Sequence, residues 1–286
     1  MSITGTLSNS GRVSDGKSLS VGGKITNDVG ATIEDIGTIS GGAGLSNKGT
    51  IKGDKLITSA YTTNEGGTIQ IGQFGDVDHA VEFYVEGGTI EVSRDSYVKS
   101  MRIGNVDAAT SVTFTGNLNV EDGFRLQDAD ASVNIGSFSG NGYVSAEAGT
   151  IKVTGDVNIE KNVGARTGGS IIVLGAVTSA TGSIQVEEGG SVTAGSANVK
   201  KLYASGENSA IIVTGAVKTD EVNINTGSSL SVNSLAARTG DALTSFSNAG
   251  DVTITSSDLT TAKFVNRGTI NKDESGTSHL DHLAVT

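Results

Sequence analysis

The sequence predicts an all-β fold, a single-stranded parallel β-helix (β-solenoid) with about 20 residues per coil and roughly 13–14 coils. Three observations support this prediction. An apolar anchor residue returns at near-constant spacing, apolar and polar residues alternate around each anchor, and the 286 residues include 41 glycines and no proline. Glycine supplies tight corners, and a chain without proline can donate every backbone N–H to a strand ladder.

The anchors are the first inward-facing residues of the repeats, and successive anchors lie 18 to 22 residues apart. Around them apolar and polar residues alternate with a period of two, as at 68–71 and 183–186, whereas a helix would repeat at i, i+3, i+4 and i+7. Such a coil cannot bury its apolar side alone, so we expect each coil to stack on the next. The anchors are Val13, Ile33, Ile51, Ile69, Ile90, Val112, Val133, Ile151, Ile171, Val192, Ile211, Leu230, Val252 and Ile270.

Each repeat contains three short strands separated by glycine-containing corners. In one repeat we expect the strands at 171–173, from 177 onward and at 184–186. The Val, Ile and Leu residues of these strands form apolar columns, and the alternating Thr, Ser, Lys and Glu face water. We expect residues 1–272 to form the β-helix and residues 273–286 to form a polar C-terminal tail or cap.

Asparagine recurs at two fixed phases of the repeat. One series precedes the anchor in the phrase Asn-x-Gly, and we expect it at corners, where asparagine tolerates left-handed backbone and hydrogen-bonds nearby backbone groups. Stacking would align these residues into side-chain amide ladders. Both series are interpreted as structural. The first is Asn9, Asn47, Asn64, Asn248 and Asn266, and the second, within the middle strand, is Asn119, Asn158 and Asn223.

The segment from Gln73 to Arg102 is denser in charged and aromatic residues than the other repeats, so it predicts an enlarged corner or a lateral surface. A parallel β-helix that cleaves polysaccharide needs clustered carboxylates or basic residues in one groove. The cluster that fits is Asp76, Asp78 and Glu82 beside Arg94 and Arg102, although a solvated, irregular corner is the simpler interpretation. The predicted binding residues are Asp76, His79, Phe83, Tyr84, Arg94 and Tyr97.

No cofactor, no metal site and no catalytic residue are predicted. The chain has no cysteine, which excludes disulfides and thiolate metal sites, and it has no phosphate-binding or nucleophile motif in a suitable context. Two groups of residues are weaker candidates for metal binding, and for both a polar tail or surface without metal is the favoured interpretation. They are His279, Asp281 and His282, and, for calcium, Asp122, Asp128 and Asp130.

Net charge and hydropathy limit the kinds of partner that we expect for the chain. A formal charge of −11 disfavours nucleic acid and anionic membranes, and no window is apolar enough for a membrane-spanning helix. The N-terminus has neither a basic region nor an apolar region, so no signal peptide is expected. It also begins in the middle of a repeat, which suggests either a missing upstream segment or end-to-end contact between coils.

The phrase Asn-x-Gly-Thr/Asp-Ile/Val carries a resemblance to a known family. Leu45-Ser-Asn47-Lys-Gly49-Thr-Ile51, with its counterparts at 246–252 and 264–270, resembles autotransporter passenger domains and other large bacterial surface adhesins. The resemblance implies a right-handed β-helix displayed outside a Gram-negative cell, with a role in adhesion, aggregation or biofilm. The family's signal peptide and C-terminal translocator barrel are missing, so we expect a fragment or signal-independent export.

The sequence therefore predicts a non-enzymatic, extracellular or cell-surface adhesin-like passenger. Its expected partners are a host or bacterial surface glycan or protein, or copies of itself, without nucleic acid or direct membrane insertion. The alternative is a self-assembling structural subunit of a filament or surface layer. A polysaccharide-processing β-helix enzyme is the third possibility.

Overall fold

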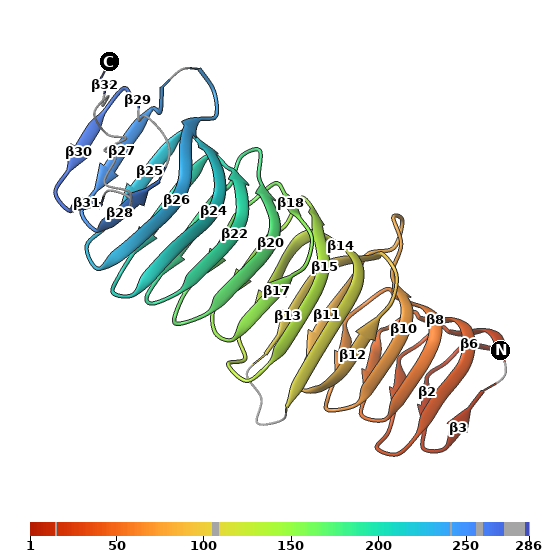
Figure 1. Cartoon of the computed structure of the whole chain (residues 1–286). Coiled ribbons are helices and arrows are strands. Elements are labelled where there is room, and N and C mark those ends of the chain that lie inside the picture. The colour runs from red at the N-terminus through yellow and green to blue at the C-terminus, as the bar shows by residue number, and fades with distance from the viewer. Residues whose placement is uncertain (15, 105–108, 241, 256–259, 272–283, 286) are drawn as a thin grey trace. The chain divides into compact units, whose positions relative to one another are not determined.

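The structure is a computed structural model that describes residues 1–14, 16–104, 109–240, 242–255, 260–271 and 284–285. The chain divides into two compact units, an N-terminal unit, Met1–Gly140, and a C-terminal unit, Asn141–Thr286. Each unit consists of parallel strands stacked with about 20 residues per turn, which confirms the predicted all-β solenoid (Figure 1). The described residues contain no helix, and so no helix that could cross a membrane.

The N-terminal unit contains strands β1 to β15, and all of its described strand pairs are parallel. The bounds are β1 (Ser2–Ile3), β2 (Leu7–Asn9), β3 (Arg12–Val13), β4 (Gly16–Val21), β5 (Ile25–Asn27), β6 (Thr32–Gly41), β7 (Leu45–Asn47), β8 (Thr50–Thr58), β9 (Thr62–Asn64), β10 (Thr68–Phe74), β11 (Val81–Val85), β12 (Gly88–Val92), β13 (Ser96–Ile103), β14 (Thr110–Leu126) and β15 (Ser132–Gly140).

The C-terminal unit contains strands β16 to β32. The bounds are β16 (Tyr143–Ala146), β17 (Thr150–Val153), β18 (Val157–Ile159), β19 (Val163–Ala165), β20 (Ser170–Thr178), β21 (Ser183–Glu187), β22 (Ser191–Asn198), β23 (Lys201–Ser205), β24 (Ser209–Thr219), β25 (Glu221–Ile224), β26 (Ser228–Ala237), β27 (Ser245–Asn248), β28 (Asp251–Ile254), β29 (Thr260–Thr261), β30 (Phe264–Asn266), β31 (Thr269–Asn271) and β32 (Ala284–Val285). β32 pairs with β29. The rest of the predicted tail at 273–286 lies outside the described residues, and its role stays a prediction.

Every coil has three sides, which we call faces A, B and C in chain order. In one coil they are formed by β17, β18 and β19, and longer strands such as β20 continue from face A through the corner into face B. The predicted anchors occupy face A. Within each unit every anchor pairs in register with the next anchor, so the predicted repeat is confirmed residue by residue.

The inward side chains of the three faces form the core of each unit. Anchors such as Ile51 and Ile171 are fully buried, while their strand neighbours Lys52 and Ile172 point outward. Full burial of such a side chain stabilises the fold by about 1.5–3 kcal/mol. The alternation seen in the sequence is therefore the division between core and surface.

A column of buried asparagines runs along face C of the N-terminal unit and confirms the predicted amide ladder. Each Nδ2 donates to the Oδ1 of the next coil's asparagine, from Asn9 to Asn27 (2.8 Å), Asn27 to Asn47 (2.9 Å) and Asn47 to Asn64 (2.8 Å). The glycine of Asn-x-Gly lies against this ladder, since a Cβ on Gly49 would be 2.8 Å from Asn27 Nδ2. The same Cβ would be still closer to the backbone carbonyl oxygens of Ala31 (2.3 Å) and Asp28 (2.4 Å), so this corner needs glycine because the backbone of the preceding coil comes so near.

Asn27, which the repeat pattern did not predict, is a full member of this ladder. Asn27 pairs with Asn47 and Thr32 with Thr50, so four residues separate the first asparagine from its threonine and two separate the second. The longer corner removes the Asn-x-Gly phrase but keeps the amide in place. The second asparagine series faces outward or is only half-buried, namely Asn119, Asn158 and Asn223.

The ladder ends where apolar residues take over its column. Val85 pairs with Asn64, and the amide of Asn64 donates instead to the carbonyls of Gly67 (2.9 Å) and Gly87 (2.8 Å). The same column of the C-terminal unit is first apolar and then returns to asparagine, where Asn248 donates to Asn266 (2.9 Å). Every amide of the column that the structure buries thus has a hydrogen-bond partner.

Candidate functional site

The enlarged corner predicted between Gln73 and Arg102 is a small hairpin between β10 and β11. Asp76 and His79 exchange two backbone hydrogen bonds of 3.1 Å, and Val77 projects from the tip into solvent. The hairpin begins at Gly75, whose φ of +54° favours glycine and whose missing Cβ would lie 2.5 Å from the His79 carbonyl.

The side chain of Asp76 organises this hairpin. It accepts hydrogen bonds from Lys55 Nζ, from His79 Nδ1 (2.9 Å) and from the backbone N–H of Asp78 (3.0 Å). The Lys55 ammonium, followed by the His79 side chain, holds the pKa of the Asp76 carboxyl well below its ordinary value. The ionised Asp76 carboxylate therefore stabilises the corner through these three hydrogen bonds.

The carboxylates predicted for polysaccharide cleavage do not converge with the two arginines. Glu82 pairs with Lys99 at 2.6 Å, and this carboxylate raises the pKa of the Lys99 ammonium. Arg94 instead contacts Asp54, and Arg102 lies over the ring of Tyr84. Within the described part of the chain, no three acidic or histidine side chains group closely enough to hold a metal ion.

The six predicted binding residues lie at separate places around the coil. Asp76 and His79 meet in the hairpin, whereas Tyr84 faces outward on face C and Tyr97 is half-buried on the outward side of face B. Phe83 is in the core, only 2% exposed, and packs against Phe74 with ring centroids 4.8 Å apart. Its place one residue before Tyr84 in the same strand turns it inward.

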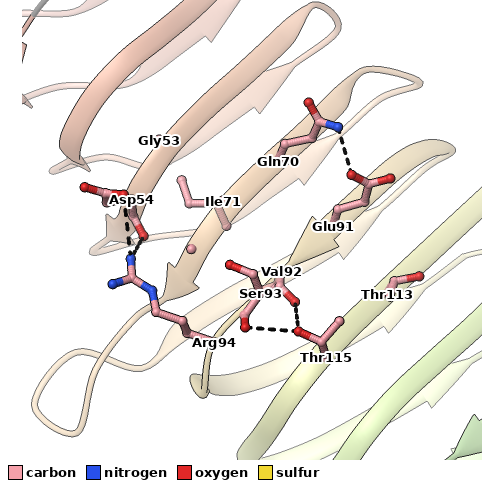
Figure 2. Close-up of a pocket in the computed structure, with 11 residues that line it drawn as sticks. Gly53, Asp54, Gln70, Ile71, Glu91, Val92, Ser93, Arg94, Thr113 and Thr115 are labelled. Carbon is pink, nitrogen blue, oxygen red and sulfur yellow. Dashed lines mark hydrogen bonds and ion pairs between the residues drawn. The ribbon is translucent and has the colours of Figure 1, made fainter.

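Arg94 lies beside an outward hollow of about 590 Å³ on face A of the N-terminal unit (Figure 2). Its guanidinium crosses Gly72 to donate to the Asp54 carbonyl at 2.6 Å, and it lies 4.0 Å from the Asp54 carboxylate. The bare backbone of Gly72 makes this crossing possible, because a Cβ there would be 2.1 Å from Arg94 Nη2.

Outward side chains from successive coils line the rest of this Arg94 hollow. Gln70 and Glu91 occupy the same register position on β10 and β12, and Gln70 Nε2 donates to Glu91 Oε2 at 2.8 Å (Figure 2). Thr115 Oγ1 donates to the Ser93 carbonyl at 3.0 Å. An amide, a carboxylate, a guanidinium and hydroxyls thus share one open, shallow surface, which suits hydrogen bonding to a polar ligand.

A second hollow, of about 540 Å³, lies on face C of the same unit. Its walls include Tyr61, which lies outside the segment predicted from Gln73 to Arg102, together with Tyr84 and Arg102. The guanidinium carbon of Arg102 is 5.3 Å from the centre of the Tyr84 ring. The sequence could not join these residues, because their contact depends on the register of three successive coils.

The candidate calcium and tail residues do not form a site among the described residues. Asp128 is 2% exposed, and its Oδ1 accepts the backbone N–H of Asp130 at 3.0 Å, while its other oxygen has no hydrogen-bond partner in the part of the chain that the structure describes. Asp122 is exposed. The histidines at 279 and 282 lie outside the described residues.

Comparison with known proteins found no matching family model, no matching curated protein and no matching solved structure. The fold and the two hollows are therefore the structural basis for any functional inference.

Proposed function

We propose that this chain is a non-enzymatic, adhesin-like passenger β-solenoid that works outside a bacterial cell or on its surface. The observation that carries the proposal is the Arg94 hollow. Its Gln70–Glu91 pair and its Arg94–Asp54 contact face solvent across several coils, and each carboxylate already has a hydrogen-bonding or ionic partner. Such a surface offers contacts to a ligand without a prepared acid, base or nucleophile.

The architecture also supports a binding role. The coils are held together by inward apolar columns and by the buried amides, so substitutions on the outside leave the main stabilising contacts intact. The resemblance of the Asn-x-Gly-Thr-Ile phrase to bacterial surface adhesins supports an extracellular location. A host or bacterial surface glycan or protein is the proposed partner.

A bead-attachment assay tests the proposal. Beads coated with the purified chain should attach to cells of a bacterial and host panel well above uncoated beads. The double variant Arg94→Gln with Glu91→Gln should lose most of the attachment, because it removes the guanidinium and one of the two carboxylates of the hollow. Arg12→Gln, on an exposed arginine paired with Glu34 (2.6 Å), is the matched control and should attach like the wild type.

Attachment equal to that of uncoated beads on every cell type would overturn the adhesion proposal. If the double variant attaches as well as the wild type, the Arg94 hollow is not the contact surface. Circular dichroism and the melting temperature of each variant should match the wild type, since the substituted side chains are exposed.

A self-assembling structural subunit is the second candidate, favoured by an uncharged outward strip on face A of the C-terminal unit. The strip is flanked by Lys152 and Asp251 and includes Ile212, which is 40% exposed. Clumping of beads in the absence of cells measures this activity, and Ile212→Lys should abolish it. The strip is Ser170, Ile172, Ser191, Thr193, Ala210, Ile212, Ser229 and Ser231.

A further inference from the structure

The hollow on face C of the N-terminal unit has the features of a sugar site with a selective group at one end. Thr63, Tyr84 and Arg102 share one register position on β9, β11 and β13, so they stand side by side in successive coils. Adjacent strands are about 4.8 Å apart, and a hollow of about 540 Å³ spanning them falls in the usual range for small-ligand sites.

Two tyrosines give this hollow aromatic surface. Tyr61, at the corner before β9, is 67% exposed, which is unusual for a side chain of its size among the described residues. Tyr84 is half-buried. The C–H face of a pyranose ring stacks well on such rings, since it is apolar while the sugar hydroxyls at its edge stay hydrogen-bonded. Thr63 and Ser100 supply hydroxyls for that edge.

Arg102 adds a cation whose orientation is fixed. Its Nε donates to Gln127 Oε1 at 2.5 Å, and its guanidinium carbon lies 5.3 Å from the Tyr84 ring centre. Among the described residues no carboxylate pairs with Arg102, so its two terminal nitrogens are available to an anion. Arg125 occupies the same register position in the next coil. A planar guanidinium held in this way matches a carboxylate with two parallel hydrogen bonds.

The C-terminal unit contains a similar cation–aromatic pair in which the charge is neutralised. Lys201 lies 5.4 Å from the ring centre of Tyr203, but its ammonium is 3.8 Å from the Glu221 carboxylate. The Tyr203 hydroxyl accepts from Asn225 at 3.4 Å. This second pair therefore lacks the open cation that an anionic ligand needs, and it is the matched control for the first.

We propose that Tyr61, Tyr84 and Arg102 form a binding site for a carboxylated pyranose. The sugar ring stacks on the exposed Tyr61 ring beside Tyr84, and its carboxylate pairs with the Arg102 guanidinium. The inference rests on the proposed adhesive function, to which it adds a second contact surface besides the Arg94 hollow and the class of glycan that this second surface binds. Uronic acids and sialic acids share this chemistry, so the test contains both.

Calorimetry on the full chain tests the site with two pairs of sugars. The first pair is a hexasaccharide of alternating glucuronic acid and N-acetylglucosamine and its carboxyl-reduced form, and the second is sialyllactose and lactose. We expect one acidic sugar to bind at least about tenfold more tightly than its neutral match, as a charge-assisted pair of hydrogen bonds predicts. The pair that shows this difference identifies the source of the carboxylate.

Single substitutions at the site test which contact each side chain makes with the sugar. Arg102→Gln should reduce the preference for the acidic sugar to about onefold, and Arg102→Lys should recover only part of it because the planar fork is lost. Tyr61→Ala should weaken the acidic and the neutral sugar alike by roughly fivefold, because it removes stacking but no charge. Lys201→Gln should bind like the wild type. Melting temperatures confirm that these exposed substitutions leave the fold intact.

Equal binding of acidic and neutral sugars by the wild type, or no binding of either, would overturn the proposed site. So would an acid preference that survives Arg102→Gln. If calorimetry shows no acid preference but the beads still attach, only the sugar site is refuted. If the chain binds an acidic sugar but its beads attach to no cell, only the adhesive function is refuted.

Discussion

The N-terminal unit holds its coils together in two different ways, and the change occurs at Asn64. Up to β9 the column along face C is a buried ladder of neutral amides, and from β11 onward the same column is Val85, Ile103 and Leu126. Coils on both sides of this change also carry ion pairs on the outside, for example Arg12 with Glu34 before it and Lys99 with Glu82 after it.

The two regions differ in what each buried position demands of its neighbours. An amide in the ladder needs an amide or a carbonyl in the next coil, because an unpaired buried polar group costs about 1–3 kcal/mol. An apolar residue needs only matching volume. The ladder therefore fixes the register between coils, even across the longer corner that follows Asn27, whereas the apolar column sets no such requirement.

The largest expected effect comes from an amide placed in the apolar column. Ile103→Asn should lower the free energy of unfolding by roughly 4 kcal/mol or more, through lost apolar contacts and an amide without a partner between Val85 and Leu126. Val85→Asn should cost clearly less, since its amide would face Asn64 and extend the ladder by one coil. Urea denaturation of both variants measures the difference.

Equal losses for Ile103→Asn and Val85→Asn would contradict the view that a neighbouring amide compensates an added one. Far-ultraviolet circular dichroism before denaturation shows whether each variant still forms strands. If Ile103→Asn fails to fold, Ile103→Val provides a milder reference, with an expected loss of about 1 kcal/mol.

The reverse substitution removes an amide from the middle of the ladder. Asn47→Ala removes one acceptor of the Asn27 amide, which still donates to the Thr50 carbonyl (3.1 Å), and leaves Asn64 Oδ1 without its donor, so we expect a loss of roughly 2–4 kcal/mol. Asn158→Ala is the matched control, because Asn158 is exposed and the expected change is within about 0.5 kcal/mol. A denaturation midpoint for Asn47→Ala equal to that of the control would show that the ladder adds no stability.

The fold could be predicted from the sequence because its determinants are periodic. Each anchor from Val13 to Ile270 follows from alternation and spacing, and both survive corners of different length. The ladder was only partly predictable. Asn47 and Asn64 carry a recognisable phrase, whereas Asn27 has a corner two residues longer and becomes a ladder member only through strand register.

The predicted site residues were harder to combine because position around a coil depends on every preceding corner. Tyr84 and Arg94 are ten residues apart in sequence, yet Tyr84 lines the hollow on face C and Arg94 lines the Arg94 hollow on face A. Tyr61 and Arg102 are 41 residues apart and line the same hollow. Composition identified the irregular segment, but only the strand register shows which of its side chains share a surface.

The smallest expected effect tests the outward ion pairs against the ladder. Asp76→Asn keeps the shape of the corner and removes its charge, so near neutral pH we expect a loss of about 1 kcal/mol or less for this partly exposed group. The pKa of Asp76 is lowered in the folded state by Lys55 and His79, so its stabilising effect is present above the unfolded value of about 4 and is lost as pH falls below it. The difference between wild type and Asp76→Asn should therefore shrink between about pH 4 and pH 2 and in about 1 M salt.

The difference between wild type and Asn47→Ala should stay constant under both changes, because neutral amides neither titrate nor respond to screening. Denaturation midpoints across pH and salt measure both series, and a ladder variant that follows the same acid dependence as Asp76→Asn would remove the distinction between the two regions.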